Sequence, residues 1–382
     1  MSITLSNIEF HLFELPLLIF MLLSCLSIIM ARGMKISLLN TKPLGQFVLG
    51  FILFLTAILT SSLFAYVPAQ SIKAFIKWAE VLVLSLLIFF YIRNHISFRF
   101  VYWLLFISAL GYPIISFYFL VSGRLADTGF RLPNPYDALF ALCLIIPFIK
   151  RRSLSFLLLG IFLTIMVFLS FSRGAWLALA ALTFYLALHF YKQNKRLTII
   201  SIAAMILFVV AISSDYLTAL VNWRWHSSFD PEMASNIERA GMIRIALKAF
   251  LSNPLFGIGA LNFSTYLLNT GDLYILRSEV LETLTPHNFF LEILCELGLF
   301  GFIALMMVFI SVHFALKFQS PGRGLKIEKC YQEGLYLLFA TFLFAIALTF
   351  IAGAYRFYLS LLCGLALSFT KAQENKSCLE RK

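Results

Sequence analysis

The chain has 382 residues, of which 61% are hydrophobic and only 13% are charged, and phenylalanine alone accounts for 42 of them. A soluble domain of this length does not have such a composition, so the sequence predicts a polytopic membrane protein. The formal net charge of +12 does not indicate a nucleic-acid partner, because the basic residues lie mainly in short connectors between apolar runs, as they do in the cytoplasmic loops of membrane proteins.

Long apolar runs follow one another along most of the chain. Backbone groups in lipid must bond within their own segment, and these runs are continuous rather than alternating, so we expect an all-α fold and not a barrel. About eleven runs, or twelve if one more is counted, are near the length that crosses ~30 Å of hydrocarbon. In chain order they are Leu12–Ala31, Gly45–Val67, Phe75–Ile92, Val101–Val121, Tyr136–Ile149, Leu154–Phe171, Ala175–Tyr191, Leu197–Ile212, Phe289–Leu316, Tyr331–Ile351 and Tyr355–Thr370.

The distribution of basic residues predicts the orientation of the chain. Most of them lie in one set of connectors, for example Lys150–Arg152 and Lys192–Arg196, and this set is therefore predicted to be cytoplasmic. The long polar stretch between the eighth and ninth runs then faces outward. We divide the chain into an N-terminal transmembrane bundle (1–212), an outer loop containing short helices (213–288), and C-terminal transmembrane helices with a cytoplasmic tail (289–382), which together form one integrated domain.

Two helix starts in the outer loop carry polar residues. Ser235 and Glu238 have the spacing of a capping box, and an apolar helical pattern follows until Pro254, which cannot continue a helix. Gly257 and Gly259 then favour a tight turn. Arg239 falls near the first turn, where free N–H groups and a guanidinium together suit an anion. The alternative is a capped amphipathic helix with solvated arginines.

The second start is the sequence Thr285-Pro286-His287-Asn288. Threonine suits the N-cap and proline the first helical position, so His287 is expected in the first turn of a long apolar helix. The helix dipole would keep the imidazole neutral, and a neutral histidine at the membrane surface can act as a general base; the alternative is a structural histidine. Glu292 and Glu296 follow within the apolar run. Carboxylates there are functional candidates, although Glu296 could simply bond a neighbouring helix.

Motifs for common cofactors and metals are absent from the sequence. It has no Walker loop, no paired-cysteine zinc spacing, no His-Glu-x-x-His and no Asp-x-Asp pair. We therefore expect neither a cofactor nor a metal. Arginines and one histidine on the outer face suit a lipid-linked phosphate donor, because arginine binds phosphate in a bidentate way and nucleotide-activated sugars are not available outside the cell.

Three motifs together resemble the O-antigen ligase and O-antigen polymerase superfamily of bacterial envelopes. The first is Arg-x-x-x-Leu at the head of a span, here Arg173-Gly-Ala-Trp-Leu177. The second is a histidine followed eleven residues later by glycine, here His287 and Gly298. The third is an arginine that opens a loop helix ending at a proline, here Arg239 to Pro254.

The resemblance implies a glycosyltransferase of the bacterial inner membrane whose active site faces the periplasm. Its donor would be an undecaprenyl-diphosphate-linked glycan and its acceptor a hydroxyl of lipid A-core, with His287 as catalytic base. Arg173 and Arg239 would bind the diphosphate, joined by Arg131, which matches less closely, and by Arg244, which is inferred only from its position five residues after Arg239. Asn288 and Glu292 would support them. Alternatives are an O-antigen polymerase, which uses a lipid-linked glycan as acceptor, a protein O-oligosaccharyltransferase, or a lipid-linked glycan flippase. A flippase would spread its polar residues through a central cavity instead of gathering them in one loop.

Overall fold

A computed structural model describes residues 2–5, 8–11, 42–94, 98–121, 135–149, 154–170, 172–191, 234–270, 285–286, 288–317, 326–348 and 356–368. A short antiparallel hairpin, β1 (Ser2–Leu5) and β2 (Ile8–His11), comes first and pairs Ser2 with His11. From Lys42 onward every described secondary-structure element is a helix, which confirms the predicted helical architecture. The hairpin was not expected.

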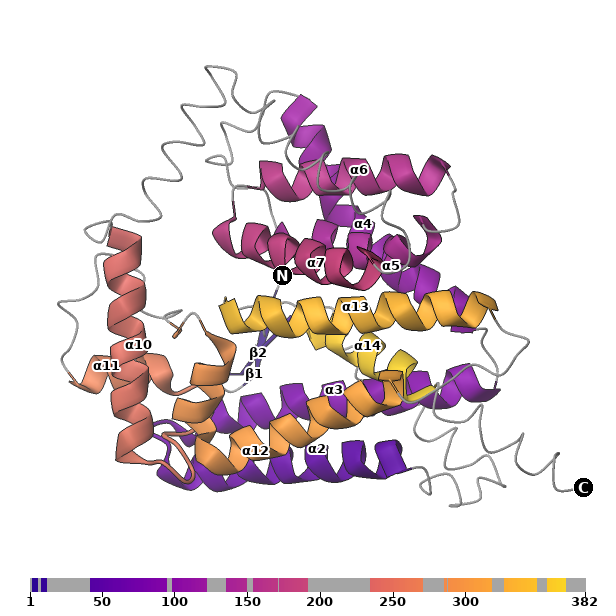
Figure 1. The fold of residues 1–382 in the computed structure, drawn as a ribbon. Coiled ribbons are helices and arrows are strands. Elements are labelled where there is room, and N and C mark those ends of the chain that lie inside the picture. Colours follow the sequence, from indigo (N-terminus) through magenta and orange to yellow (C-terminus); the bar gives the residue numbers. More distant parts are fainter. Residues whose placement is uncertain are drawn as a thin grey trace, which may run out of the picture.

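The helices follow in the order expected from the apolar runs (Figure 1). They are α2 (Lys42–Ser61), the 3-10 turn η2 (Ser62–Phe64), α3 (Pro68–Asn94), α4 (Phe98–Val121), α5 (Pro135–Ile149), α6 (Leu154–Leu169), α7 (Arg173–Tyr191), α10 (Ala234–Ser252), α11 (Phe263–Thr270), α12 (Phe289–Lys317), α13 (Lys326–Leu348) and α14 (Arg356–Ser368).

Five of the described helical segments are long and apolar enough to cross a membrane: Pro43–Phe64, Pro68–Ile92, Phe98–Ile115, Phe289–Lys317 and Lys329–Ala347. Four shorter apolar helices, Tyr136–Ile149, Leu154–Leu169, Gly174–Leu186 and Tyr358–Ser368, accompany them. The predicted spans Leu12–Ala31 and Leu197–Ile212 lie outside the described residues. The chain is a membrane protein on these grounds, while the number of eleven or twelve spans and the outward orientation of the loop stay predictions.

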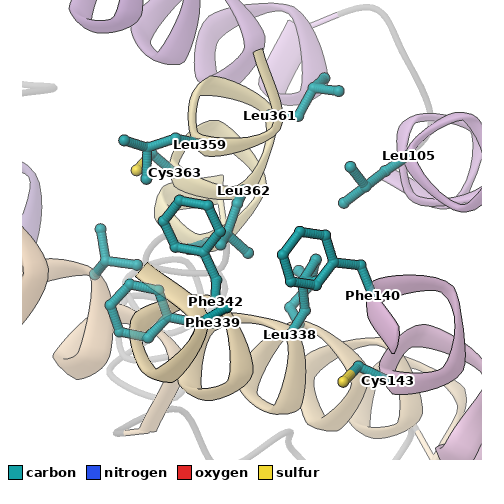
Figure 2. Packing of buried hydrophobic residues seen from close by; sticks show 14 of the residues in the cluster. Leu105, Phe140, Cys143, Leu338, Phe339, Phe342, Leu359, Leu361, Leu362 and Cys363 are labelled. Atoms are coloured by element: carbon teal, nitrogen blue, oxygen red, sulfur yellow. The ribbon is translucent and has the colours of Figure 1, made fainter. Parts of the chain in front are cut away.

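The helices of the two ends of the chain pack against one another. The second half of α12 runs along α2, and α14 lies against α3. Helix α5 is buried on all sides between α4, α6 and α13, as expected for a helix that is apolar all round. Figure 2 shows part of this core, where Phe140 of α5 faces Leu338 and Phe342 of α13.

Helix α12 is broken at Gly298. This residue has φ 65° and ψ −167°, far from helical values, so α12 consists of two helical pieces joined at an angle. The first piece lies beside α10, and the second runs with α2 (Figure 1). The single uninterrupted helix that the sequence predicted over Phe289–Leu316 is therefore wrong. The break brings the start of α12 to one end of the bundle, where α10 and α11 lie.

Candidate active site

The break in α12 is completed by the turn that follows α10. A helix interrupted at Gly298 leaves carbonyl groups before the break and N–H groups after it without partners in their own helix. The turn supplies these partners through four backbone hydrogen bonds: Ile258 N to Cys295 O (3.0 Å), Gly259 N to Glu296 O (3.0 Å), Leu299 N to Pro254 O (2.9 Å) and Phe300 N to Leu255 O (3.2 Å). We call this arrangement, made of residues 254–262 and 295–300, the interlock.

Two glycines allow the interlock to close. Gly257 and Gly298 have φ angles of 71° and 65°, which side chains of L-residues rarely adopt. A Cβ atom at Gly257 would lie 2.3 Å from the carbonyl of Glu296, and one at Gly298 would lie 2.4 Å from the carbonyl of Leu255. Each glycine therefore serves both its own backbone conformation and the approach of the opposite segment. The tight turn predicted at Gly257 and Gly259 is confirmed.

The side chain of Glu296 holds the turn from inside the first piece of α12. Its carboxyl group is buried and accepts hydrogen bonds from Leu261 N (2.7 Å) and Phe263 N (3.2 Å). Phe263 is the first residue of α11, so the carboxyl group also satisfies a donor that the start of that helix leaves open. Glu296 thus bonds a neighbouring helix, which was the structural alternative considered from the sequence.

Asn262 ties the same turn to the membrane-spanning part. Its Oδ1 atom accepts a hydrogen bond from Val67 N (2.8 Å), and its Nδ2 atom donates to Ala260 O (2.9 Å) and Ser71 Oγ (3.3 Å). Ser71 Oγ also donates to Ala260 O (3.1 Å). Val67 and Ser71 lie at the beginning of α3. The turn is therefore fixed both to α12 and to the start of a candidate membrane span.

Asn288 is the N-cap of α12. Its Oδ1 atom accepts a hydrogen bond from Leu291 N (3.0 Å), and its Nδ2 atom donates to Ala347 O (2.8 Å) near the end of α13. The predicted cap at Thr285 is wrong, because α12 begins at Phe289 and asparagine caps as well as threonine does. His287 itself lies outside the described residues.

Glu292 lies one turn into α12 and is buried. Within the described residues its Oε2 atom has no hydrogen-bond partner, which is uncommon because an unsatisfied buried polar atom carries a desolvation cost. Both carboxyl oxygens of Glu296 accept hydrogen bonds from backbone N–H groups, whereas one carboxyl oxygen of Glu292 accepts none from the described residues. The two carboxyl groups of the predicted site region therefore differ in what they can still bind.

For Arg173 and Arg239 the structure describes the position of the backbone, whereas for Arg244 it also describes the exposure of the side chain. Helix α10 starts within one or two residues of the predicted cap and ends at Ser252, just before Pro254 as expected. Its buried face, Met242, Ile245, Ala246 and Ala249, packs with Leu291 and Cys295 of α12. Arg244 is exposed on the other side of α10. The side chain of Arg239, three residues before Met242, lies outside the described side chains.

Arg173 is the first residue of α7, and the hydroxyl of Ser172 accepts a hydrogen bond from Ala175 N (3.4 Å) at this helix start. The link between α6 and α7 lies at the same end of the bundle as α10 and the start of α12 (Figure 1). The Arg173 side chain and the whole of Arg131 lie outside the described residues. The backbones at Arg173, Arg239, Arg244, Asn288 and Glu292 thus share one end of the molecule.

Residues 156–306 match the protein family described as O-antigen ligase. This region of the chain is therefore similar to O-antigen ligases. The matched region is less than half of the chain, but it contains every predicted site residue except Arg131. It indicates O-antigen ligase or polymerase-type glycosyl transfer in general terms. A search of curated proteins finds no match.

Sequence reasoning did not find the role of Asn262, and it offered the bonding role of Glu296 only as an alternative. The sequence did offer one signal for this arrangement, which is the position of two glycines. Gly257 follows the pattern of one helix, and Gly298 interrupts the pattern of another. Among the described residues, no three histidine, cysteine, aspartate or glutamate side chains lie close enough together to hold a metal ion. Metal independence stays a prediction.

Proposed function

We propose that this chain transfers a glycan from undecaprenyl diphosphate to a hydroxyl of lipid A-core on the periplasmic face of the bacterial inner membrane. The observation that carries the proposal is the match of residues 156–306 to the O-antigen ligase family, which takes in both helix starts that the sequence singled out. The shared location of α7's beginning, α10 and the start of α12 at one end of the bundle supports it (Figure 1).

In the proposed reaction His287 takes the proton from the acceptor hydroxyl as its oxygen attacks the anomeric carbon of the donor sugar. The bond between that carbon and the diphosphate oxygen breaks, and undecaprenyl diphosphate leaves. Arg173, Arg239, Arg244 and Arg131 stabilise the charge that develops on the diphosphate. Because these cations do the work of a divalent ion, full activity is expected in the presence of a chelator, and strict dependence on a divalent ion would contradict the mechanism.

Asn288 and Glu292 have supporting roles in this proposal. Asn288 fixes the start of α12, directly after His287, against α13. Glu292 offers a buried carboxyl oxygen one turn further along, which suits either an arginine of the donor site or a hydroxyl of the acceptor. Both residues act at the helix start that follows the proposed base.

A second candidate is an O-antigen polymerase, since the family match supports ligase or polymerase-type transfer in general and does not distinguish the two. The test is a strain lacking the gene, examined by lipopolysaccharide gel with lipid-linked glycans extracted in parallel. Loss of all polymer from lipid A-core with accumulation of lipid-linked polymer supports the ligase. A single repeat attached to the core indicates the polymerase, and an unchanged lipopolysaccharide pattern overturns both. If the chain were a protein O-oligosaccharyltransferase, loss of the gene would instead leave proteins without their glycan.

A further inference from the structure

Helix α10 lies across one end of the bundle instead of alongside the membrane-spanning helices. Figure 1 shows its axis running transverse to α2 and α3, with the lower part of α10 beside their ends. The α2 span runs to Phe64, and the ring of Phe64 stacks on Phe256 in the turn after α10, with centroids 5.6 Å apart and planes 5° apart. Helix α10 is therefore positioned at the level where a candidate membrane span ends.

Helix α10 carries apolar side chains on two sides, one buried in the protein and one exposed. Met242, Ile245, Ala246 and Ala249 are buried in the protein. Ile243, Leu247 and Leu251, spaced by four residues, form a second stripe on an adjacent side of the helix. Their side chains are exposed, that of Leu251 by 73%. Arg244 and Lys248 directly follow the first two members of the stripe and are also exposed.

The second stripe continues into other exposed apolar side chains at the same end of the molecule. Leu255, in the turn after α10, is exposed, and Leu63 in η2 is 81% exposed. Leu255 precedes Phe256, which stacks on Phe64, so these positions form one apolar region around the end of a membrane span. An apolar region of this extent requires a covering partner.

We infer that α10 is embedded in the membrane interface. The stripe of Ile243, Leu247 and Leu251 inserts among the acyl chains, and the exposed Arg244 and Lys248 border it at the level of the lipid headgroups. A bilayer fits this surface better than a protein does because the stripe adjoins the end of a span and carries basic residues at its edge, as interfacial helices do. The inference concerns the seating of the helix and does not rest on glycosyl transfer.

The test uses the full chain with one added cysteine at a time on α10, labelled with a nitroxide and reconstituted into phosphatidylethanolamine–phosphatidylglycerol vesicles. Positions 243, 247 and 251 probe the stripe, and positions 244 and 248 on the same helix are the matched controls. The unsubstituted chain, with its six cysteines, gives the background signal. Relaxation by lipid-soluble oxygen is compared with relaxation by a water-soluble nickel chelate.

The expected result is high oxygen and low nickel relaxation at all three stripe positions, with the reverse at positions 244 and 248. Equal nickel relaxation at all five positions would show that the stripe faces water and would overturn the inference. Protection of the stripe from both reagents would show that a protein surface, such as a second copy of this chain, covers it, and would overturn it as well. A variant that does not elute as the folded protein is replaced by the cysteine at a neighbouring stripe position.

Discussion

Gly257 and Gly298 each approach the peptide backbone next to the other, so that the turn after α10 and the break in α12 hold one another in place. The two glycines lie far apart in the sequence, yet their neighbours exchange four backbone hydrogen bonds. Both have positive φ angles, and both would bring a Cβ atom within 2.4 Å of backbone.

Alanine at Gly257 or Gly298 is therefore expected to destabilise the protein severely. The conformational strain alone is worth about 1–3 kcal/mol, and the overlap with backbone atoms cannot be relieved by rotating a side chain. Gly111→Ala is the matched control, since a Cβ atom there meets no described atom within 4 Å. Thermal unfolding in detergent micelles measures the effect. Equal unfolding temperatures for the three variants would contradict the interlock.

Replacement of Glu296 should loosen the interlock by removing acceptors. Glu296→Ala removes the partners of Leu261 N and Phe263 N, which predicts a loss of about 3 kcal/mol because each buried donor left without a partner costs about 1–3 kcal/mol. Glu296→Gln keeps one acceptor and should fall between the alanine variant and the natural chain. Unfolding temperature and protease sensitivity of the turn are the measurements, and a glutamine variant less stable than alanine would argue against this role.

Asn288 has two separable contributions to the start of α12. Asn288→Asp keeps the oxygen that caps the helix and loses the donor to Ala347, whereas Asn288→Ala loses both. The alanine variant should cost about 1 kcal/mol more, the usual value of an N-cap. Thermal unfolding ranks the two variants, and hydrogen exchange at Leu291 reports on the cap itself. Identical exchange at Leu291 in both variants would count against Asn288 as the cap.

Glu292→Gln tests whether the unpaired carboxyl oxygen serves activity. Since Oε2 has no partner within the described residues, the isosteric change should leave the unfolding temperature close to that of the natural chain. Glycan transfer is expected to fall by at least about tenfold if that oxygen binds a cation, which corresponds to the roughly 1.4 kcal/mol lower limit for losing a charged hydrogen bond. Transfer to lipid A-core in reconstituted vesicles is the assay. Full transfer by a stable Glu292→Gln protein would remove Glu292 from the site.

His287→Ala should abolish glycan transfer while the protein remains folded in the membrane, because a positioned general base contributes about 10²–10⁴-fold to the rate. His189 lies near the C-terminal end of α7, the end opposite Arg173, and serves as a control histidine. His189→Ala is expected to retain transfer. Donor binding measured separately should survive in His287→Ala. Retained transfer in that variant would exclude the general-base role.

Hydropathy located the described candidate spans, because a long apolar run can be recognised from the sequence without knowing which other segments it packs against. The end of α10 followed from Pro254, whose effect is local. The break at Gly298 could not be found in this way, because its cause lies in Pro254 and Leu255, which supply the acceptors from a distant part of the chain. The cap was misplaced for a related reason: Thr285 and Asn288 both have capping side chains, and the bond from Asn288 to Ala347 depends on how α13 packs.

The hydrogen bonds of Asn262 have a consequence for dissecting this protein into parts. Its partners are Val67, just before α3, and Ser71 in its first turn, well upstream of residues 156–306, which match the family. A fragment cut to the matched region would expose the polar groups of this junction and the apolar surface that α2 covers on α12. The segment that holds α10 and α11 is therefore not a transferable module, and grafting it onto another scaffold would require the α2–α3 turn to be carried with it.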